Sequence, residues 1–193
     1  MVRKSEKQRT TNETNVFVSL DLDGIGKGTV ATGIGFLDHM MDLFKKHSGF
    51  DLSVKLDGDI EVDTHHSMED LGIVLGQTFN EALGDKLGIK RFSFFYVPMD
   101  EALVRVCVDI SGRSYLNYQA EFTSETIGDL ETETVEEFLR AFSDNAKITL
   151  HVHVLEGKNN HHICEAIFKA LAKALADAVQ ITGTGIPSTK GLL

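Results

Sequence analysis

The sequence predicts an α+β fold made by internal duplication, with two similar halves in which strands and helices follow the same order. Segments of alternating apolar and polar residues are followed by segments with helical spacing, and this succession occurs twice. A His-His-x-x-Glu motif also opens the last helix of each half, at His65 and again 96 residues later at His161. We therefore expect one half-repeat over residues 1–90 and a second over 91–193, joined into one compact unit.

The first half opens with the clearest strand pattern of the chain. Apolar residues alternate with polar ones between Asn15 and Asp23, which is typical of a strand with one buried face. The glycines in 24–28 predict a hairpin turn, and apolar spacing of three and four residues from Phe36 predicts a helix. The expected elements are strands at 15–23 and 29–34, a helix at 36–48, extended segments at 51–56 and 60–62, and a helix at 64–83.

Asp63 or Thr64 is the expected N-cap of that long helix, and Gly84 is expected to end it. The second half repeats the succession, with an acidic linker at 124–133 before its first helix. Its expected elements are strands at 91–97, 102–110, 115–122 and 148–155, and helices at 135–145 and 160–179. The face that the last helix buries is indicated by one apolar stripe, made of Ile163, Ala166, Ile167, Ala170, Leu171, Ala174, Leu175, Ala178 and Val179.

The composition is that of an acidic globular protein. Of 193 residues, 42% are apolar and 25% are charged, which is enough apolar material for a core. An excess of 29 acidic over 19 basic residues gives a net charge of −10, so nucleic acid is not an expected partner. Cys107 and Cys164 cannot form a disulfide framework, which favours a reducing compartment, the cytoplasm. The sequence contains neither a membrane-spanning stretch nor a signal peptide, so no membrane partner is expected.

Histidine is the unusual residue of this composition. There are eight histidines, and six of them lie in two short segments. Imidazole and carboxylate ligands, with almost no thiol available, favour the binding of borderline divalent metals. The two His-His-x-x-Glu motifs are therefore candidate metal sites.

Helix geometry divides each motif between two ions. Residues i and i+4 lie about 40° apart around a helix, so His65 and Glu69 can share one ion. Adjacent residues diverge by about 100°, which directs His66 to another ion, and the same holds for the motif at 161–165. The simplest closed arrangement has two ions, each held by the His/Glu pair of one motif and the second histidine of the other.

His39 and His151 would complete three imidazoles and one carboxylate for each ion, leaving open positions on a six-coordinate metal such as Mn²⁺ or Fe²⁺. Ordinary structural interpretations remain open. A single motif could be a plain first helical turn, and His39 could be a helix-surface residue. His47 could interact with a helix dipole. His151 and His153 lie on the same strand face, so the residue pattern alone leaves both as candidate ligands.

Six segments together closely resemble the imidazoleglycerol-phosphate dehydratase family of histidine biosynthesis, over about residues 9–193. These segments are Gly35-Phe-Leu-Asp-His-Met40, Thr64-His-His-Ser-Met-Glu-Asp70, Pro98-Met-Asp-Glu-Ala102, Asp109-Ile-Ser-Gly-Arg113, Asn160-His-His-Ile-Cys-Glu165 and Pro187-Ser-Thr-Lys-Gly191. The resemblance implies two halves of the ribosomal protein S5 domain 2-like type, each a four-stranded sheet with helices on one face. It also implies an octahedral homo-oligomer of about 24 copies, with active sites and their two Mn²⁺ ions at subunit interfaces.

The resemblance also implies a ligand set for each ion. One ion would take His39, His66, His161 and Glu165. The other would take His65, Glu69, His151 and His162. This division agrees with the helix geometry, and it prefers His151 to His153, whose position is usually not a ligand in the family.

The implied reaction converts a small-molecule substrate, D-erythro-imidazoleglycerol phosphate, to imidazoleacetol phosphate. The abstracted proton lies on a carbon with no adjacent carbonyl, so the resemblance implies a dimetal-bound imidazolate and a diazafulvene-like intermediate. Glu13 matches a family glutamate near the substrate and is the expected proton-transfer group, although it could be an exposed residue before a strand. His47 matches a position near the reacting end of the substrate, and Asp100 is expected to support it.

The family's phosphate-binding positions are matched by five residues, namely Arg91, Arg113, Lys169, Ser188 and Lys190. The residue pattern alone would make Lys169 a solvated side chain and 183–191 a flexible tail, whereas the resemblance implies that this tail folds over the phosphate. The chain departs from the family at Leu43, where a phosphate-contacting glutamine is common, and at Ser114, where proline is usual.

Other functions also fit a site with two metals. A hydrolase would use the ions to activate water for phosphoester cleavage, and phosphate release would distinguish it from a dehydratase. A non-enzymatic metal-binding or RNA-binding module could have the same duplicated halves, although the sequence lacks the basic patch that RNA requires. A fused phosphatase domain is not expected, because the resemblance to the dehydratase family extends over nearly the whole chain.

Overall fold

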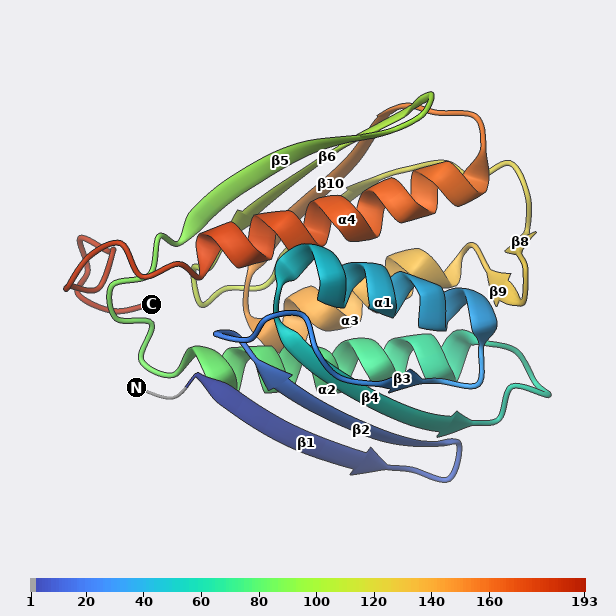
Figure 1. Ribbon diagram of the computed structural model, residues 1–193, viewed down its shortest axis with the longest axis horizontal. Helices are drawn as coiled ribbons and strands as arrows, with labels where there is room; N and C mark the ends of the chain where they lie inside the picture. The colour runs from blue at the N-terminus through green and yellow to red at the C-terminus, as the bar shows by residue number, and fades with distance from the viewer. Residues whose placement is uncertain (1–2) are drawn as a thin grey trace.

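The computed structural model describes residues 3–193, in which two four-stranded sheets form the outer layers and the long helices lie between them (Figure 1). The elements of the first half are β1 (Lys4–Thr10), β2 (Thr14–Asp21), β3 (Val30–Ala31), α1 (Gly35–Ser48), β4 (Asp51–Gly58) and α2 (His65–Leu83). Those of the second half are β5 (Phe92–Met99), β6 (Ala102–Asp109), β7 (Tyr115–Gln119), β8 (Thr126–Ile127), β9 (Leu130–Glu131), α3 (Thr134–Ala146), β10 (Thr149–Glu156) and α4 (Asn160–Ala178).

The two halves have the same topology. The strand orders are β1-β2-β4-β3 and β5-β6-β10-β7. In each sheet a hairpin comes first, the strand after the next helix pairs antiparallel with it, and a parallel edge strand completes the sheet. The predicted α+β duplication, with four-stranded sheets and helices on one face, is confirmed. The boundary near Lys90 stays a prediction.

The first sheet differs from expectation in two of its strands, β1 and β3. Strand β1 was not expected, because its residues are polar or exposed along most of its length. The segment after Gly24 does not form a hairpin with β2, since β3 pairs in parallel with β4. The Asp51 carboxylate accepts hydrogen bonds from the backbone N–H groups of Ile25 and Lys27, at 2.9 and 2.7 Å, and so fastens this loop to β4.

The segment 60–62 is a turn rather than a strand, closed by a hydrogen bond from the Val62 N–H to the Asp59 carbonyl. The strand before this turn is longer than the expected segment 51–56, because residues 57 and 58 also belong to β4 and pair with Asn15 and Thr14. Pairing with the long strand β2 therefore extends β4 as far as Gly58.

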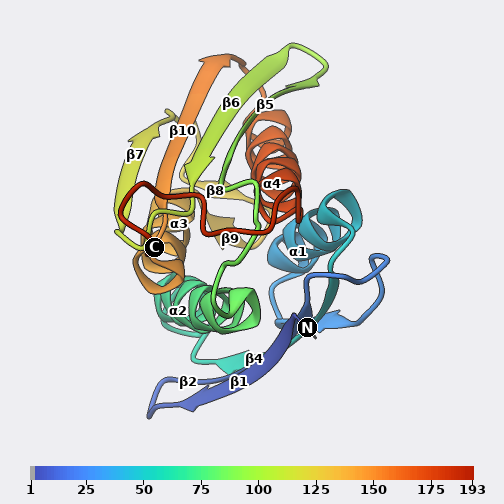
Figure 2. The same cartoon turned by 90° about the vertical axis from the view of Figure 1, so that its left-hand side faces the viewer.

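Helix α2 packs on α3, and α1 packs on α4, so the halves join through their helices (Figure 2). The α2–α3 contact is close because Gly72 and Gly76 face α3. A Cβ atom at Gly72 would lie 2.6 Å from the Phe138 carbonyl oxygen, and one at Gly76 would lie 2.7 Å from that of Phe142. The apolar stripe predicted for α4 is fully buried in this shared core.

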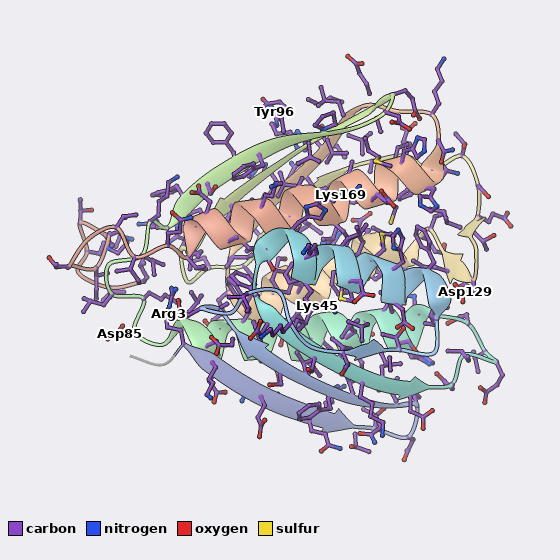
Figure 3. The ribbon with its side chains drawn as sticks, viewed as in Figure 1. Arg3, Lys45, Asp85, Tyr96, Asp129 and Lys169 are labelled. Atoms are coloured by element: carbon purple, nitrogen blue, oxygen red, sulfur yellow. The ribbon has the colours of Figure 1, made fainter. Side chains whose placement is uncertain are left out.

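The acidic linker contains a small hairpin, β8–β9, that caps helices of the other half. Asp129 accepts hydrogen bonds from the N–H groups of Gly35 and Phe36, at 2.6 and 2.9 Å, at the start of α1 (Figure 3). Glu131 accepts hydrogen bonds from the backbone N–H and the hydroxyl of Thr64, just before α2. Thr64 is the N-cap of α2 as expected, but its side chain makes no capping bond there.

The outer faces of the sheets are open in the single chain. Phe92, Phe94 and Tyr96 alternate along edge strand β5, and they are 55%, 65% and 50% exposed. Figure 3 shows Tyr96 on the outer side of β5. Across residues 3–193, no helix has both the length and the apolar character needed to cross a membrane.

Candidate metal centre and cationic pocket

Two imidazoles and one carboxylate converge where α1 packs on α4. His39 comes from the first turns of α1, whereas His161 and Glu165 lie one turn apart at the start of α4. Glu165 Oε1 lies 2.7 Å from His39 Nε2 and 3.2 Å from His161 Nε2. One ligand atom from each residue lies within 4.8 Å of the others, so the three could hold a metal ion. This donor set, two nitrogens and one carboxylate oxygen, fits a borderline divalent ion.

Glu165 is the buried member of this triad, with 8% of its side chain exposed, while His39 and His161 are 43% and 46% exposed. Burial alone raises the pKa of Glu165, but hydrogen bonds from Lys169, His39 and His161 outweigh burial and bring the pKa to about 2. The Lys169 ammonium lies 2.6 Å from Glu165 Oε2. The carboxylate is therefore ionised and correctly oriented to be a ligand.

His66 turns away from this triad and toward a different pair of carboxylates. Its Nδ1 lies 3.0 Å from Asp59 Oδ2, and its Nε2 lies 3.8 Å from Glu13 Oε1. The hydrogen bond to Asp59, reinforced by the negative charges nearby, raises the pKa of His66. Glu13 lies in the turn between β1 and β2, so that turn brings the expected proton-transfer group beside a predicted ligand.

His162 has an equivalent arrangement at the start of α4. Its Nδ1 lies 2.7 Å from Glu101 Oε2, and its Nε2 lies 3.7 Å from Asp100 Oδ2. The bond to Glu101 raises the pKa of His162, and the same bond, followed by backbone N–H donors, lowers the pKa of Glu101 to about 2. Asn159 caps α4 through the N–H groups of His161 and His162.

The remaining predicted ligands are not brought together within one chain. His65 and Glu69 lie at the start of α2, in the first half. His151 lies on β10 between the buried residues Leu150 and Val152, so it projects from the outer face of the second sheet. Among residues 3–193, the triad at Glu165 is the only group of three or more ligand atoms that converges.

His47 lies on the last turn of α1, and charged residues of α4 influence its imidazole. Burial, followed by the positive charges of Lys169 and Lys173, lowers the pKa of His47. Its imidazole is therefore neutral near pH 7, which permits it to accept a proton or a hydrogen bond.

A pocket of about 820 Å³ joins the carboxyl-terminal segment to the start of β5. It is lined by four of the five predicted phosphate-binding residues, Arg91, Arg113, Ser188 and Lys190. Asp109 orients the Arg91 guanidinium through contacts of 2.7 and 3.2 Å, and the Pro187 carbonyl accepts a third bond at 2.8 Å. Lys169 lies outside this pocket, beside Glu165 in the middle of α4 (Figure 3).

A family model described as imidazoleglycerol-phosphate dehydratase matches residues 32–175. An imidazoleglycerol-phosphate dehydratase from a Thermoanaerobacter species is 60% identical to this chain over 194 aligned positions, with 100% of each protein covered. The chain belongs to the imidazoleglycerol-phosphate dehydratase family.

Solved structures of imidazoleglycerol-phosphate dehydratases have the same fold. The crystal structure from Staphylococcus aureus has a TM-score of 0.85 at 44% identity and covers 93% of this chain and 99% of its own. The structure from Pyrococcus furiosus has a TM-score of 0.83 at 36% identity and covers 97% of this chain and 100% of its own. Membership of this dehydratase family suggests metal use, and the triad at Glu165 is a group that could hold an ion.

Two residues of this family member were missed by reasoning from the sequence. Asp59 and Glu101 each contact the second histidine of a motif, yet each lies in a turn, outside any helical spacing. The only available signal was that Glu101 belongs to the segment Pro98-Met-Asp-Glu-Ala102. His153 has different partners, Arg105 at Nδ1 and Asn117 at Nε2, and the latter bond is 2.8 Å long.

Proposed function

We propose that this chain dehydrates imidazoleglycerol phosphate to imidazoleacetol phosphate in L-histidine biosynthesis, in the cytoplasm. The observation that carries the proposal is the convergence of His39, His161 and Glu165 in a member of the dehydratase family. These three residues are three of the four that the resemblance assigns to one ion. Their distances suit a metal ligand set, and a neutral His47 lies nearby on α1.

Two Mn²⁺ ions per active site are part of the proposal, one held by His39, His66, His161 and Glu165, and the other by His65, Glu69, His151 and His162. When bound, such ions supply Lewis acids that favour the deprotonated form of the substrate's imidazole ring. Neither ligand set is complete within one chain, because His66 turns away from the triad, and His151 lies on β10 whereas His65 and Glu69 lie on α2. We therefore infer a homo-oligomer of about 24 copies with shared sites.

The chain's own residues meet the difficulty of the reaction, which is to remove a proton from a carbon without an adjacent carbonyl. The deprotonated ring donates electrons as the side-chain hydroxyl takes up a proton and leaves as water, which gives a diazafulvene-like intermediate. This intermediate then loses the proton of the neighbouring carbon. Glu13 is proposed to move the proton, since its carboxylate is 53% exposed and lies 3.8 Å from His66 Nε2. Asp100 has the corresponding place beside His162, 3.7 Å away.

The phosphate group of the substrate is proposed to bind in the pocket of Arg91, Arg113, Ser188 and Lys190. Arginine donates paired hydrogen bonds to phosphate oxygens, and Lys190 adds a point charge. Lys169 does not line this pocket within one chain, and its ammonium is paired with Glu165. In the proposed assembly, a neighbouring copy would bring the pocket and Lys169 to the same substrate.

The test is a dehydratase assay of the purified protein supplied with Mn²⁺. We expect imidazoleacetol phosphate to form without release of inorganic phosphate, two manganese ions per active site by elemental analysis, and an assembly mass of about 24 chains. Release of phosphate in place of dehydration would contradict the proposal and favour a metal hydrolase. Clear binding of RNA at low salt, without turnover, would also contradict it.

A further inference from the structure

We propose that Asp59 and Glu101 are positioning residues that hold His66 and His162 ready to bind metal through Nε2. Each carboxylate accepts a hydrogen bond from the Nδ1–H of its histidine. This inference rests on the proposed function, since it concerns the metal ligands of that site. It adds two residues for which neither helix spacing nor the family resemblance implies a role.

The contact between Asp59 and His66 is the simpler of the two. Both carboxylate oxygens of Asp59 lie close to His66 Nδ1, at 3.0 and 3.2 Å. Asp59 is only 22% exposed, and His66 is 34% exposed, so the imidazole ring is restrained rather than free in solvent. Within residues 3–193, His66 is the sole hydrogen-bond partner of the Asp59 side chain, which leaves no other evident role for this carboxylate.

Glu101 makes the corresponding contact with His162, at 2.7 Å from Nδ1. Its other oxygen accepts hydrogen bonds from the backbone N–H groups of Lys158 and Asn159, at 3.2 and 2.7 Å. The carboxylate is thus fixed by the backbone just before α4. Through Glu101, the turn between β5 and β6 sets the orientation of the His162 ring.

The chemical consequence follows from what a carboxylate can do. An ionised carboxylate only accepts hydrogen bonds, so the proton of a neutral imidazole must sit on Nδ1. The lone pair is then on Nε2, which is the ligand atom that a metal needs. A carboxylate behind a metal-binding histidine also raises the basicity of the imidazole and fixes its rotamer.

The two contacts arise from loops that do not correspond in the duplication. Asp59 follows β4 and precedes its own helix, whereas Glu101 lies in the hairpin between β5 and β6. The carboxylates near Nε2 do correspond, since Glu13 and Asp100 both lie in the first hairpin turn of their halves. The same hydrogen bond at Nδ1 has therefore been reached in two different ways, which indicates a shared requirement at the two histidines rather than simple inheritance.

The experiment measures Mn²⁺ affinity of the assembled protein by competition with a chelator, followed by elemental analysis. We expect Asp59→Ala and Glu101→Ala each to weaken the affinity of one of the two ions by about 10-fold to 100-fold. Asp59→Asn keeps an oxygen that accepts the Nδ1 hydrogen bond, so it should restore much of the loss. The matched control is Asp57→Ala, which removes an exposed carboxylate two residues away on β4.

A second measurement separates positioning from a general structural effect. If Asp59 acts through His66, then adding Asp59→Ala to a His66→Ala variant should cause no further loss of Mn²⁺ affinity. Further loss in that background, or unchanged affinity in Asp59→Ala and Glu101→Ala, overturns the inference while the proposed function stands. If the unaltered protein binds no Mn²⁺ at all, the proposed function fails together with it.

Discussion

At the scale of single residues, adjacent histidines in each motif have different neighbours. His161 faces Glu165 within its own helix, whereas His162 turns to Glu101 on the second sheet. The rotation of about 100° per residue predicts this divergence from sequence alone. It could not predict the carboxylate acceptors, because Glu101 precedes His162 by more than 60 positions and only the fold brings them together.

Glu69 provides the first residue-scale prediction. It is an exposed carboxylate one turn after His65 and is a proposed ligand of the second ion. Glu69→Gln keeps the size of the side chain but removes the charge, so we expect metal content to fall and turnover to be lost. Elemental analysis and the dehydratase assay check this together. Full metal content with a normal rate would show that the ligand assignment is wrong.

Lys190 provides the second residue-scale prediction, since it lines the pocket proposed for the phosphate group. Lys190→Ala removes a charge that binds the substrate equally before and during the reaction, so KM should rise about 10-fold or more while kcat changes little. Steady-state kinetics at several substrate concentrations measure both constants. A large fall in kcat with unchanged KM would place Lys190 at the reacting centre instead.

At the scale of elements, helices α2 and α3, which belong to different halves, pack closely against each other. The α2–α3 contact depends on Gly72 and Gly76, which look like weak points of a helix in the sequence. The hairpin β8–β9 lies in a segment that the residue pattern predicts only as an acidic linker. Its two-residue strands are too short to produce any detectable alternation.

Gly72→Ala tests the helix contact. Alanine is favoured over glycine within a helix by about 1 kcal/mol. However, the added Cβ would lie 2.6 Å from the Phe138 carbonyl oxygen and 2.9 Å from the Ala141 Cβ. Overpacking costs about 1–3 kcal/mol, so we expect a net loss in the free energy of unfolding. Urea unfolding measures it, with Gly183→Ala as a control, because a Cβ at Gly183 would meet no atom within 4 Å. A stabilised Gly72→Ala variant would contradict this account.

Asp129→Ala tests the cap that β8–β9 supplies to α1. Loss of the two hydrogen bonds to Gly35 and Phe36 should lower the free energy of unfolding by about 1 kcal/mol at pH 7. Partial burial raises the pKa of Asp129, but the bonds to those N–H groups lower it below its ordinary value of 3.8. The stabilisation by Asp129 is therefore complete above the unfolded-state pKa and disappears as pH falls through the folded-state value.

Unfolding of the unaltered and Asp129→Ala proteins in urea, at pH 7 and at pH values below 3.8, measures this effect. The difference between the two proteins should shrink at the lower pH values. A difference that grows on acidification would contradict the capping role.

At the scale of the whole molecule, the proposed ligands lie on three surfaces of one chain: the α1–α4 contact, the start of α2 and the outer face of the second sheet. Most of the fold could be predicted from the sequence because buried strands and helices have clear periodicity. Strand β1 could not, since it pairs with β2 through its backbone while its side chains are mostly exposed. The nearness of His39 to Glu165 likewise depends on helix packing, which no local pattern encodes.

The proposed sharing of active sites between chains predicts complementation. His66→Ala and Glu165→Gln should each be inactive alone, because each damages one motif. When the two variants are co-expressed in equal amounts, about a quarter of the sites should combine two intact motifs and recover activity. Co-expression of His66→Ala with Glu69→Gln is the control, since both damage the same motif and no recovery is expected. Absence of recovery in the first pair, in assemblies shown to be mixed, would indicate sites within single chains.

The capping of α1 and α2 by β8–β9 has a consequence for synthesis of the protein. Asp129 leaves the ribosome long after Gly35, which it caps. At about 5–20 residues per second, the delay is about 5–20 s. During that time the residues of α1 and α2 have been made, but the carboxylates that accept hydrogen bonds at their first turns have not. The starts of both helices therefore gain these acceptors only after the second half has been synthesised.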